Sequence, residues 1–260
     1  MRIRKPCAAQ TAGLGNIFSQ KNNKGEENET MKKILALVLV LIMALGLAAC
    51  AAPAAPAEEP TPAAEPETEK VDSQAILAEL KTPAEESNWE RTTSSQEVID
   101  FLKVVAEHSA GRIILDTTTF ATEAGTPISY MIISDVAPAS PADVPEDKGV
   151  VYVNCNIHSG EIEGKESMMI FAREVAQGKH DDLLKDLVVI IVPNSNPDGN
   201  DNLGKNRITT QFTPKLVGTR AEGNGLNVNR DMTKLETACG RTIVKLMNDW
   251  NPILFIDAHA

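Results

Sequence analysis

The sequence predicts an α/β fold, in which a mixed, largely parallel β-sheet is flanked by helices. Two short apolar runs, at 149–154 and 187–192, are typical of strands that are buried in a sheet. Between them, residues 161–178 carry apolar side chains at helical spacing. A strand, a helix and a second strand at this separation form a βαβ unit, whose two strands run parallel. A further helix at 235–248 and a further apolar strand at 252–257 extend the same pattern.

The elements before this unit are a helix and two strands. Residues 112–118 and 127–134 read as strands, and residues 137–148 form a loop rich in Pro and Asp. Residues 94–110 are expected to form a helix with Ser95 as its N-cap. The apolar side chains recur on one face of that helix, at Val98, Phe101, Leu102, Val105 and Ala106.

Two cysteines lie in the expected globular part. Cys155 falls in a predicted strand and Cys239 in a predicted helix. Their spacing fits no recognisable disulfide framework, so two buried free thiols are favoured over a disulfide.

The first fifty residues have the composition of a leader and an export signal. Residues 1–30 are polar and without periodicity, and we expect translation to start at Met31. Residues 31–50 combine a basic start, an apolar run too short for a membrane span and small residues at the end. The segment 47–50 resembles a bacterial lipoprotein signal, so Cys50 is expected to be lipidated. The alternative is an ordinary cleaved signal with a chance cysteine. The lipoprotein interpretation predicts an exported protein, anchored to the membrane at the bacterial cell surface.

Residues 51–90 are expected to form a disordered tether. They are rich in Ala, Pro and Glu, and their apolar content is too low to form a core. Their acidic side chains also repel one another, which favours an extended chain. Ten acidic residues against two lysines give this segment a net charge of −8, whereas the whole chain carries −11. No cluster of Lys and Arg is available to meet phosphates, which argues against a nucleic-acid partner. The globular domain is then expected to span residues 91–260.

Polar motifs follow three of the predicted strands, at the point where each strand ends. His158 and Glu161 follow the first strand, the Asn-Pro-Asp-Gly segment 196–199 follows the second, and His259 follows the last. In open α/β sheets the ligand crevice lies beyond the carboxyl ends of the strands. The three loops are therefore expected to meet at one site.

Neutral imidazole and carboxylate are the ligands that a catalytic zinc ion uses, with a fourth position left for water. Each motif is weak alone, because a Glu three residues after a His occurs by chance and a lone His is more often a core or surface residue. Their conjunction at the strand ends predicts one zinc site, held by His158, Glu161 and His259.

An Asn-Arg pair at Asn229 and Arg230 suggests an anion site. A guanidinium binds a carboxylate through two parallel hydrogen bonds. If the pair stood alone, a surface arginine in a loop would be the simpler explanation.

This ordered set of motifs resembles the zinc carboxypeptidase family, the carboxypeptidase A-type metallopeptidases, over roughly residues 89–260. The resemblance implies a zinc carboxypeptidase-like fold, a single zinc ion on the three ligands named above, and a peptide substrate whose terminal carboxylate binds Asn229 and Arg230. It also implies an arginine that polarises the scissile carbonyl, between the Asn-Pro-Asp-Gly and Asn-Arg motifs. Arg207 is the first candidate for this role and Arg220 the second.

Two departures from the family pattern stand out. The family has an Asp two residues before the Asn-Arg pair, as partner of the first zinc-binding His, whereas this chain has Asn227. The family's general-base Glu, and the strands and pocket around it, would lie beyond residue 260. We therefore expect the chain to be incomplete at its C-terminus and inactive as given, with its last strand exposed and prone to aggregation.

The functional expectation is a zinc metallocarboxypeptidase that removes C-terminal residues from peptides. One alternative is a zinc amidase or deacylase that acts on peptidoglycan peptides or acyl-amino acids. Another is a lipoprotein that captures peptides without cleaving them.

Overall fold

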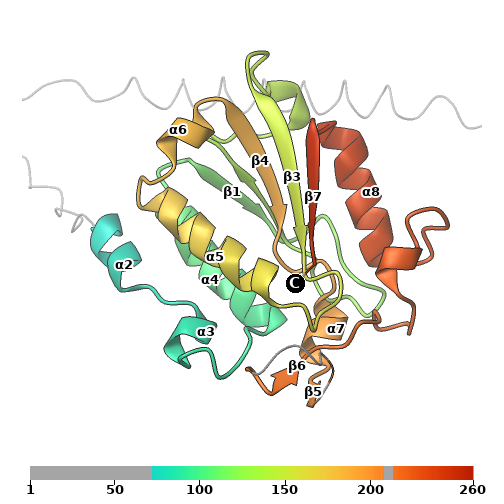
Figure 1. Cartoon of the computed structure of the whole chain (residues 1–260). Coiled ribbons are helices and arrows are strands. Elements are labelled where there is room, and N and C mark those ends of the chain that lie inside the picture. Colours follow the sequence, from blue (N-terminus) through green and yellow to red (C-terminus); the bar gives the residue numbers. More distant parts are fainter. Residues whose placement is uncertain (1–71, 206, 208–212, 260) are drawn as a thin grey trace, which may run out of the picture. The chain divides into compact units, whose positions relative to one another are not determined.

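The central sheet has five strands in the order β1-β2-β4-β3-β7 (Figure 1). These strands are β1 (Ile113–Asp116), β2 (Tyr130–Ile133), β3 (Gly149–Cys155), β4 (Leu187–Val192) and β7 (Leu254–Ala258). Strand β3 pairs in parallel with both β4 and β7, whereas β1 and β2 are antiparallel to their neighbours. The mixed sheet and the parallel βαβ unit predicted from the sequence are confirmed.

The computed structural model describes residues 72–205, 207 and 213–259. The leader, the export signal with Cys50 and the tether up to residue 71 lie outside the described residues. Of the described helices, none is long and apolar enough to cross a membrane.

Helices cover both faces of the sheet (Figure 1). The helices α4 (Ser95–Glu107) and α5 (Glu163–Ala176) pack on one face, and α8 (Ala238–Trp250) packs on the other. The apolar side chains of β4 alternate between the two faces, because successive side chains of a strand point in opposite directions. Val189 and Ile191 join the core under α4 and α5, and Val188 and Ile190 join the core under α8.

Shorter elements connect these layers. They are α2 (Ser73–Glu79), α3 (Pro83–Glu86), η1 (Pro141–Asp143), α6 (Asp181–Leu184), α7 (Pro197–Asp201), β5 (Gly204–Lys205), β6 (Leu216–Val217) and η2 (Val228–Arg230). Strands β5 and β6 form a separate antiparallel pair. Cys155 and Cys239 are buried free thiols, as predicted, and burial raises the pKa of Cys155 to about 12.

The N-cap of α4 is Ser94, one residue before the predicted cap. Its hydroxyl accepts from the backbone N–H of Glu97, and the Glu97 carboxylate accepts in turn from the backbone N–H of Ser94. This reciprocal arrangement is a capping box. Ser95 instead lies inside the helix, and its hydroxyl donates to the carbonyl of Pro197 at 3.1 Å. The prediction of Ser95 as the N-cap was wrong, because a capping box needs a Glu or Gln three positions after the cap. Glu97 meets this requirement for Ser94 and not for Ser95.

The tether does not extend to residue 90 as predicted, because α2 and α3 belong to the fold. Leu77 of α2 is fully buried and Ala84 of α3 is 1% exposed. Arg173 of α5 binds both carboxylate oxygens of Glu85, at 2.6 and 2.9 Å. A segment with few apolar residues can thus fold when those few side chains pack into the core formed by the rest of the domain. The globular part therefore begins by residue 72 rather than 91.

Strand β7 forms one edge of the sheet within the described part of the chain. Leu254 and Ile256, two residues apart, are 51% and 42% exposed. The expected exposure of this last strand is thus present in the structure.

Candidate metal centre

The centre lies at the carboxyl ends of the three parallel strands β4, β3 and β7 (Figure 1). After β3, Asn156 takes a left-handed conformation with φ of 60°, and the chain turns through His158 into α5. After β7, the next residue is His259. The parallel pairing of β3 with β7 sets Cys155 beside Ala258, so both histidines emerge at the same edge.

The three predicted zinc ligands converge there. One ligand atom from each of His158, Glu161 and His259 lies within 4.8 Å of the other two. The Glu161 carboxylate lies 3.1 Å from Nδ1 of His158 and 2.8 Å from Nδ1 of His259. His158 is 1% exposed, whereas the side chain of His259 is 32% exposed. The cluster is therefore enclosed on the His158 side and open to ligands on the His259 side.

The outward nitrogen of each ring has its own acceptor. Nε2 of His158 donates to Oδ1 of Asn227 at 3.0 Å, and the same oxygen accepts from the backbone N–H of Asn229. Nε2 of His259 donates to Oδ2 of Asp257 at 2.8 Å. Both rings thus direct Nδ1 toward Glu161. Partners of this kind fix ring orientation in zinc sites, so the residues present fit a zinc ion with three protein ligands and an open position.

Arg220, rather than Arg207, lies at this cluster. Nη1 of Arg220 is 3.4 Å from Oε1 of Glu161, and its side chain is 55% exposed. The reason is backbone pairing next to the histidine: Ser159 N–H donates to the carbonyl of Thr219 at 3.2 Å, and Gly218 N–H donates to the carbonyl of Ser159 at 3.1 Å. This pairing brings the following residue, Arg220, to the metal ligands.

Arg207, the first candidate from the sequence, is directed elsewhere. Its guanidinium donates to the backbone carbonyl and the side chain of Asn202, on the turn before β5. Of the two candidates, Arg220 is thus the one that the structure places beside the predicted metal ligands. Sequence spacing alone did not show that residues 218 and 219 pair with the His158 loop.

The Asn-Arg pair lies beside the open histidine. Asn229, in η2, places Nδ2 3.5 Å from Nε2 of His259. Arg230 is exposed and donates to the carbonyl of Asn229 at 2.7 Å. The Arg230 guanidinium is therefore open to an anion from solvent, and the preceding residue lies next to His259.

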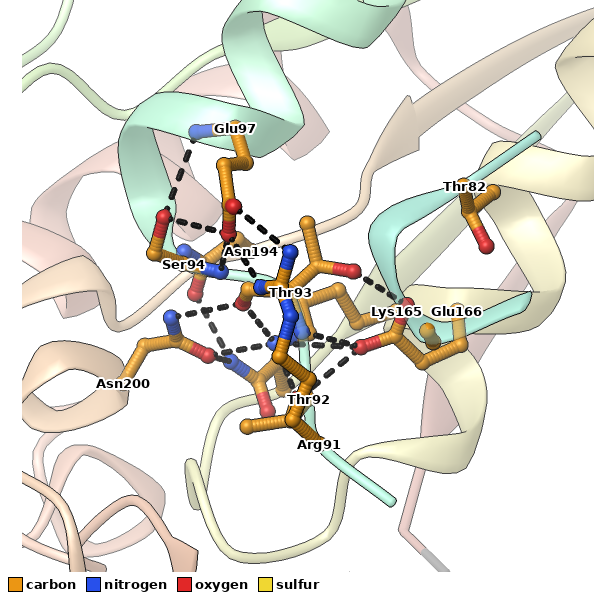
Figure 2. Close-up of polar contacts among 12 residues, drawn as sticks. Thr82, Arg91, Thr92, Thr93, Ser94, Glu97, Lys165, Glu166, Asn194 and Asn200 are labelled. Atoms are coloured by element: carbon orange, nitrogen blue, oxygen red, sulfur yellow. Dashed lines mark hydrogen bonds and ion pairs between the residues drawn. The ribbon is translucent and has the colours of Figure 1, made fainter. Parts of the chain in front are cut away.

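A buried polar network joins the start of α5 to the segment before α4, and the sequence analysis did not predict it (Figure 2). The Lys165 ammonium donates to the Thr92 hydroxyl at 2.7 Å, to the Thr93 carbonyl at 2.6 Å and to Oδ1 of Asn200 at 2.6 Å. The Glu166 carboxylate accepts from both threonine hydroxyls and from the Thr93 N–H, at 2.7–2.9 Å.

This network reaches the turn that leads to His158. Oδ1 of Asn200 accepts from Asn156 at 3.0 Å as well as from Lys165. Burial lowers the pKa of Lys165. The sequence did contain a signal, since Lys165 lies four residues before Met169 on the buried stripe of α5. A charged residue on an apolar stripe indicates a buried partner.

The chain belongs to the zinc carboxypeptidase family, whose model matches residues 100–253. The match includes His158, Glu161, Arg220 and the Asn229-Arg230 pair, and it ends before His259. A search of curated protein sequences finds no match.

Three solved structures of metallocarboxypeptidases are similar to this chain. Carboxypeptidase A from Helicoverpa armigera is 18% identical with a TM-score of 0.52, over 72% of this chain and 50% of that chain. A metallo-carboxypeptidase from Burkholderia cenocepacia is 20% identical with a TM-score of 0.49, over 65% of this chain and 41% of that chain. The metallo-carboxypeptidase from Pseudomonas aeruginosa, in complex with (2-guanidinoethylmercapto)succinic acid, is 17% identical with a TM-score of 0.47. The match covers 64% of this chain and 39% of that chain. The chain thus spans 39–50% of the length of these proteins.

Proposed function

We propose that this chain carries the zinc centre of a metallocarboxypeptidase that hydrolyses C-terminal peptide bonds. The observation that supports the proposal is the convergence of two imidazole nitrogens and one carboxylate within 4.8 Å, in a chain of the zinc carboxypeptidase family. Zinc bound there would polarise the scissile carbonyl and lower the pKa of a water molecule.

The protein's own side chains would position the substrate around that ion. Arg220, beside Glu161, is a fixed cation for the carbonyl oxygen that becomes negative in the transition state. Asn229, next to His259, and the exposed Arg230 that follows it are suited to the terminal carboxylate of a peptide. This division of roles predicts a substrate with a free C-terminus.

We further propose that the 260-residue chain binds such peptides but turns them over weakly. Glu161 is a metal ligand in this assignment, and Asp257 is hydrogen-bonded to His259. Neither carboxylate is then free to accept a proton from water, as a general base must. Peptide binding by Arg220, Asn229 and Arg230 does not require a general base.

The proposed location is the bacterial cell surface. The export signal and the lipoprotein-type Cys50 support it, since together they would tether the domain to the membrane through a lipid. Metabolic labelling with a clickable fatty acid, with Cys50→Ser as control, tests this part separately: label on the native chain alone supports it, and no label contradicts it.

The first experiment measures zinc and peptide binding by the full chain. We expect one zinc ion per chain, and weaker zinc binding in His158→Ala and Glu161→Gln. With zinc present, we expect an N-blocked dipeptide with a free carboxylate to bind more tightly than its C-terminal amide. Arg230→Ala should remove that difference, and Lys234→Ala, a nearby exposed cation, should retain it.

The outcomes separate the candidate functions. A chain that binds no zinc contradicts the whole proposal. Equal affinity for the acid and the amide contradicts the assignment of Arg230 and favours an amidase or deacylase. Rapid zinc-dependent hydrolysis of the dipeptide would contradict weak turnover, whereas binding without hydrolysis is also the behaviour of a peptide-binding lipoprotein.

A further inference from the structure

The two histidines of the centre have chemically different partners. Nε2 of His158 meets the neutral amide oxygen of Asn227 at 3.0 Å, and Nε2 of His259 meets the carboxylate of Asp257 at 2.8 Å. A carboxylate behind a ligating imidazole fixes the ring and makes it a stronger donor to the metal than an amide does. The centre therefore has one carboxylate-supported histidine, and it is His259.

Asp257 is itself held in place. It is the next-to-last residue of β7 and lies opposite Asn154 of β3, in the register of the parallel pair. Nδ2 of Asn154 donates to Oδ1 of Asp257 at 3.0 Å, while Oδ2 of Asp257 accepts from His259. Asn154 is fully buried, and the Asp257 side chain is 22% exposed. One oxygen is thus fixed by the sheet, and the other is presented to the imidazole.

We propose that Asp257 is a positioning residue of the zinc centre, which orients His259, and that Asn154 orients Asp257. The inference rests on the proposed zinc site. It also bears on Asn227, which gives His158 an amide partner where a carboxylate is expected. In this chain the carboxylate partner is found on the other histidine, His259. His259 needs this support more, because its ring is partly exposed and lies at the edge strand, whereas His158 is enclosed by its loop.

The competing explanation is that Asp257 only joins two strands. Its bond to Asn154 links β7 to β3, and its loss could loosen the sheet without any specific effect on metal binding. The two roles differ in what they change. A positioning role alters zinc affinity in the folded protein, and a structural role alters the stability of the metal-free protein.

The test measures zinc affinity by competition with a chromophoric chelator, and thermal unfolding of the metal-free full chain. Asp257→Asn should weaken zinc binding about 10- to 100-fold, the usual cost of removing such a partner. The midpoint of metal-free unfolding should change little, because an amide retains the shape and one acceptor. Asn154→Ala should weaken binding in the same direction and by less. Asp100→Asn, which removes a surface carboxylate of α4, is the charge control and should bind zinc as the native chain does.

The decisive variant moves the carboxylate to the other histidine. Asn227→Asp retains the acceptor for the Asn229 N–H, and in the Asp257→Asn background it should restore most of the lost affinity. Native-like zinc binding by Asp257→Asn overturns the inference while the proposed function stands. An affinity loss without rescue, accompanied by an equal loss of metal-free stability, also overturns it and assigns Asp257 to the sheet. A native chain that binds no zinc overturns the proposed function and the inference together.

Discussion

The Lys165 ammonium lies 3.5 Å from the Glu166 carboxylate in the interior of the fold, where Lys165 is fully buried and Glu166 is 3% exposed. Both charges are satisfied by Thr92 and Thr93, which come from the segment before α4 (Figure 2). A buried ion pair contributes little net stability when intact, but removing one partner leaves an uncompensated charge. The pair therefore links the segment before α4 to the first turn of α5.

Lys165→Met should destabilise the protein by about 3–5 kcal/mol, because Glu166 would remain buried without its cation. Urea unfolding followed by circular dichroism measures this change. The control is Lys179→Met, which removes an exposed lysine 3.0 Å from Glu174 and should change stability by less than about 1 kcal/mol. Similar effects of the two substitutions would contradict the role of the buried pair.

Stability should fall as the pH is lowered from about 4.5 toward 2. Hydrogen bonds from Arg91 lower the pKa of Glu97 to about 2, and hydrogen bonds from Arg173 lower the pKa of Glu85. A carboxyl whose pKa is depressed by folding stabilises the native state above its unfolded pKa, and this contribution is lost as the pH falls through the folded pKa.

Urea midpoints measured between pH 5 and pH 2 test this dependence. In Glu97→Gln the decrease should be shallower than in the native chain, because that group no longer titrates. Glu107→Gln, which removes an exposed carboxylate at the end of α4, should retain the native slope. A Glu97→Gln profile parallel to the native one would rule out this linkage. The effect of Glu97 is expected to be modest, since its side chain is 37% exposed and solvent screens the pair.

Arg220→Ala should reduce affinity for a tetrahedral phosphonate analogue of a peptide by about 10²–10³-fold, as removal of an oxyanion-stabilising group does. Arg207→Ala should bind the analogue as the native chain does, because Arg207 is bonded to Asn202. Isothermal titration of the zinc-loaded proteins gives both values. A larger loss in Arg207→Ala would restore the original order of the two candidates.

Gly164 allows the start of α5 to approach β3 and β7. A Cβ at this position would meet the Cβ of Ala258 at 2.9 Å and the Cβ of Cys155 at 3.2 Å. Gly164→Ala should therefore displace the end of β7, which precedes His259, and reduce both zinc affinity and the unfolding temperature. Ser167→Ala, at an exposed position of the same helix, should change neither. Native-like zinc binding by Gly164→Ala would show that the end of β7 can shift without effect on the centre.

The exposed edge strand should cause self-association. Leu254 and Ile256 present exposed apolar side chains on β7, which pairs on only one side with a strand of the described residues, and this combination promotes edge-to-edge pairing. Light scattering at increasing protein concentration should show association of the native chain and less association of Ile256→Lys. Val136→Lys, at a 76% exposed position away from the edge, is the control and should associate as the native chain does. A native chain that stays monomeric would contradict this expectation.

Local patterns in the sequence were sufficient for the main elements. The run 187–192 is a strand with the predicted bounds, and 149–155 extends its prediction by one residue. Both runs are predominantly apolar, as is typical of strands buried on both faces of a sheet. The helix ends were less accurate: α8 ends at Trp250 rather than at 248, and α5 begins at Glu163 rather than at 161.

The candidate ligands His158, Glu161 and His259 were identified from motif and position, because the carboxyl ends of parallel strands meet at one edge of a sheet. The sequence by itself thus determined the fold class, the three residues that converge and the edge at which they do so.

Only the tertiary structure decided which partners surround them. Arg220 reaches Glu161 because residues 218 and 219 pair with Ser159, some sixty residues earlier in the chain. Lys165 and Glu166 are buried because Thr92 and Thr93 fold beneath α5, and Asp257 faces His259 because Asn154 on another strand fixes its second oxygen. Such contacts depend on the distance and orientation of groups far apart in sequence, which follow from the packing of the whole sheet and its helices rather than from local periodicity or spacing.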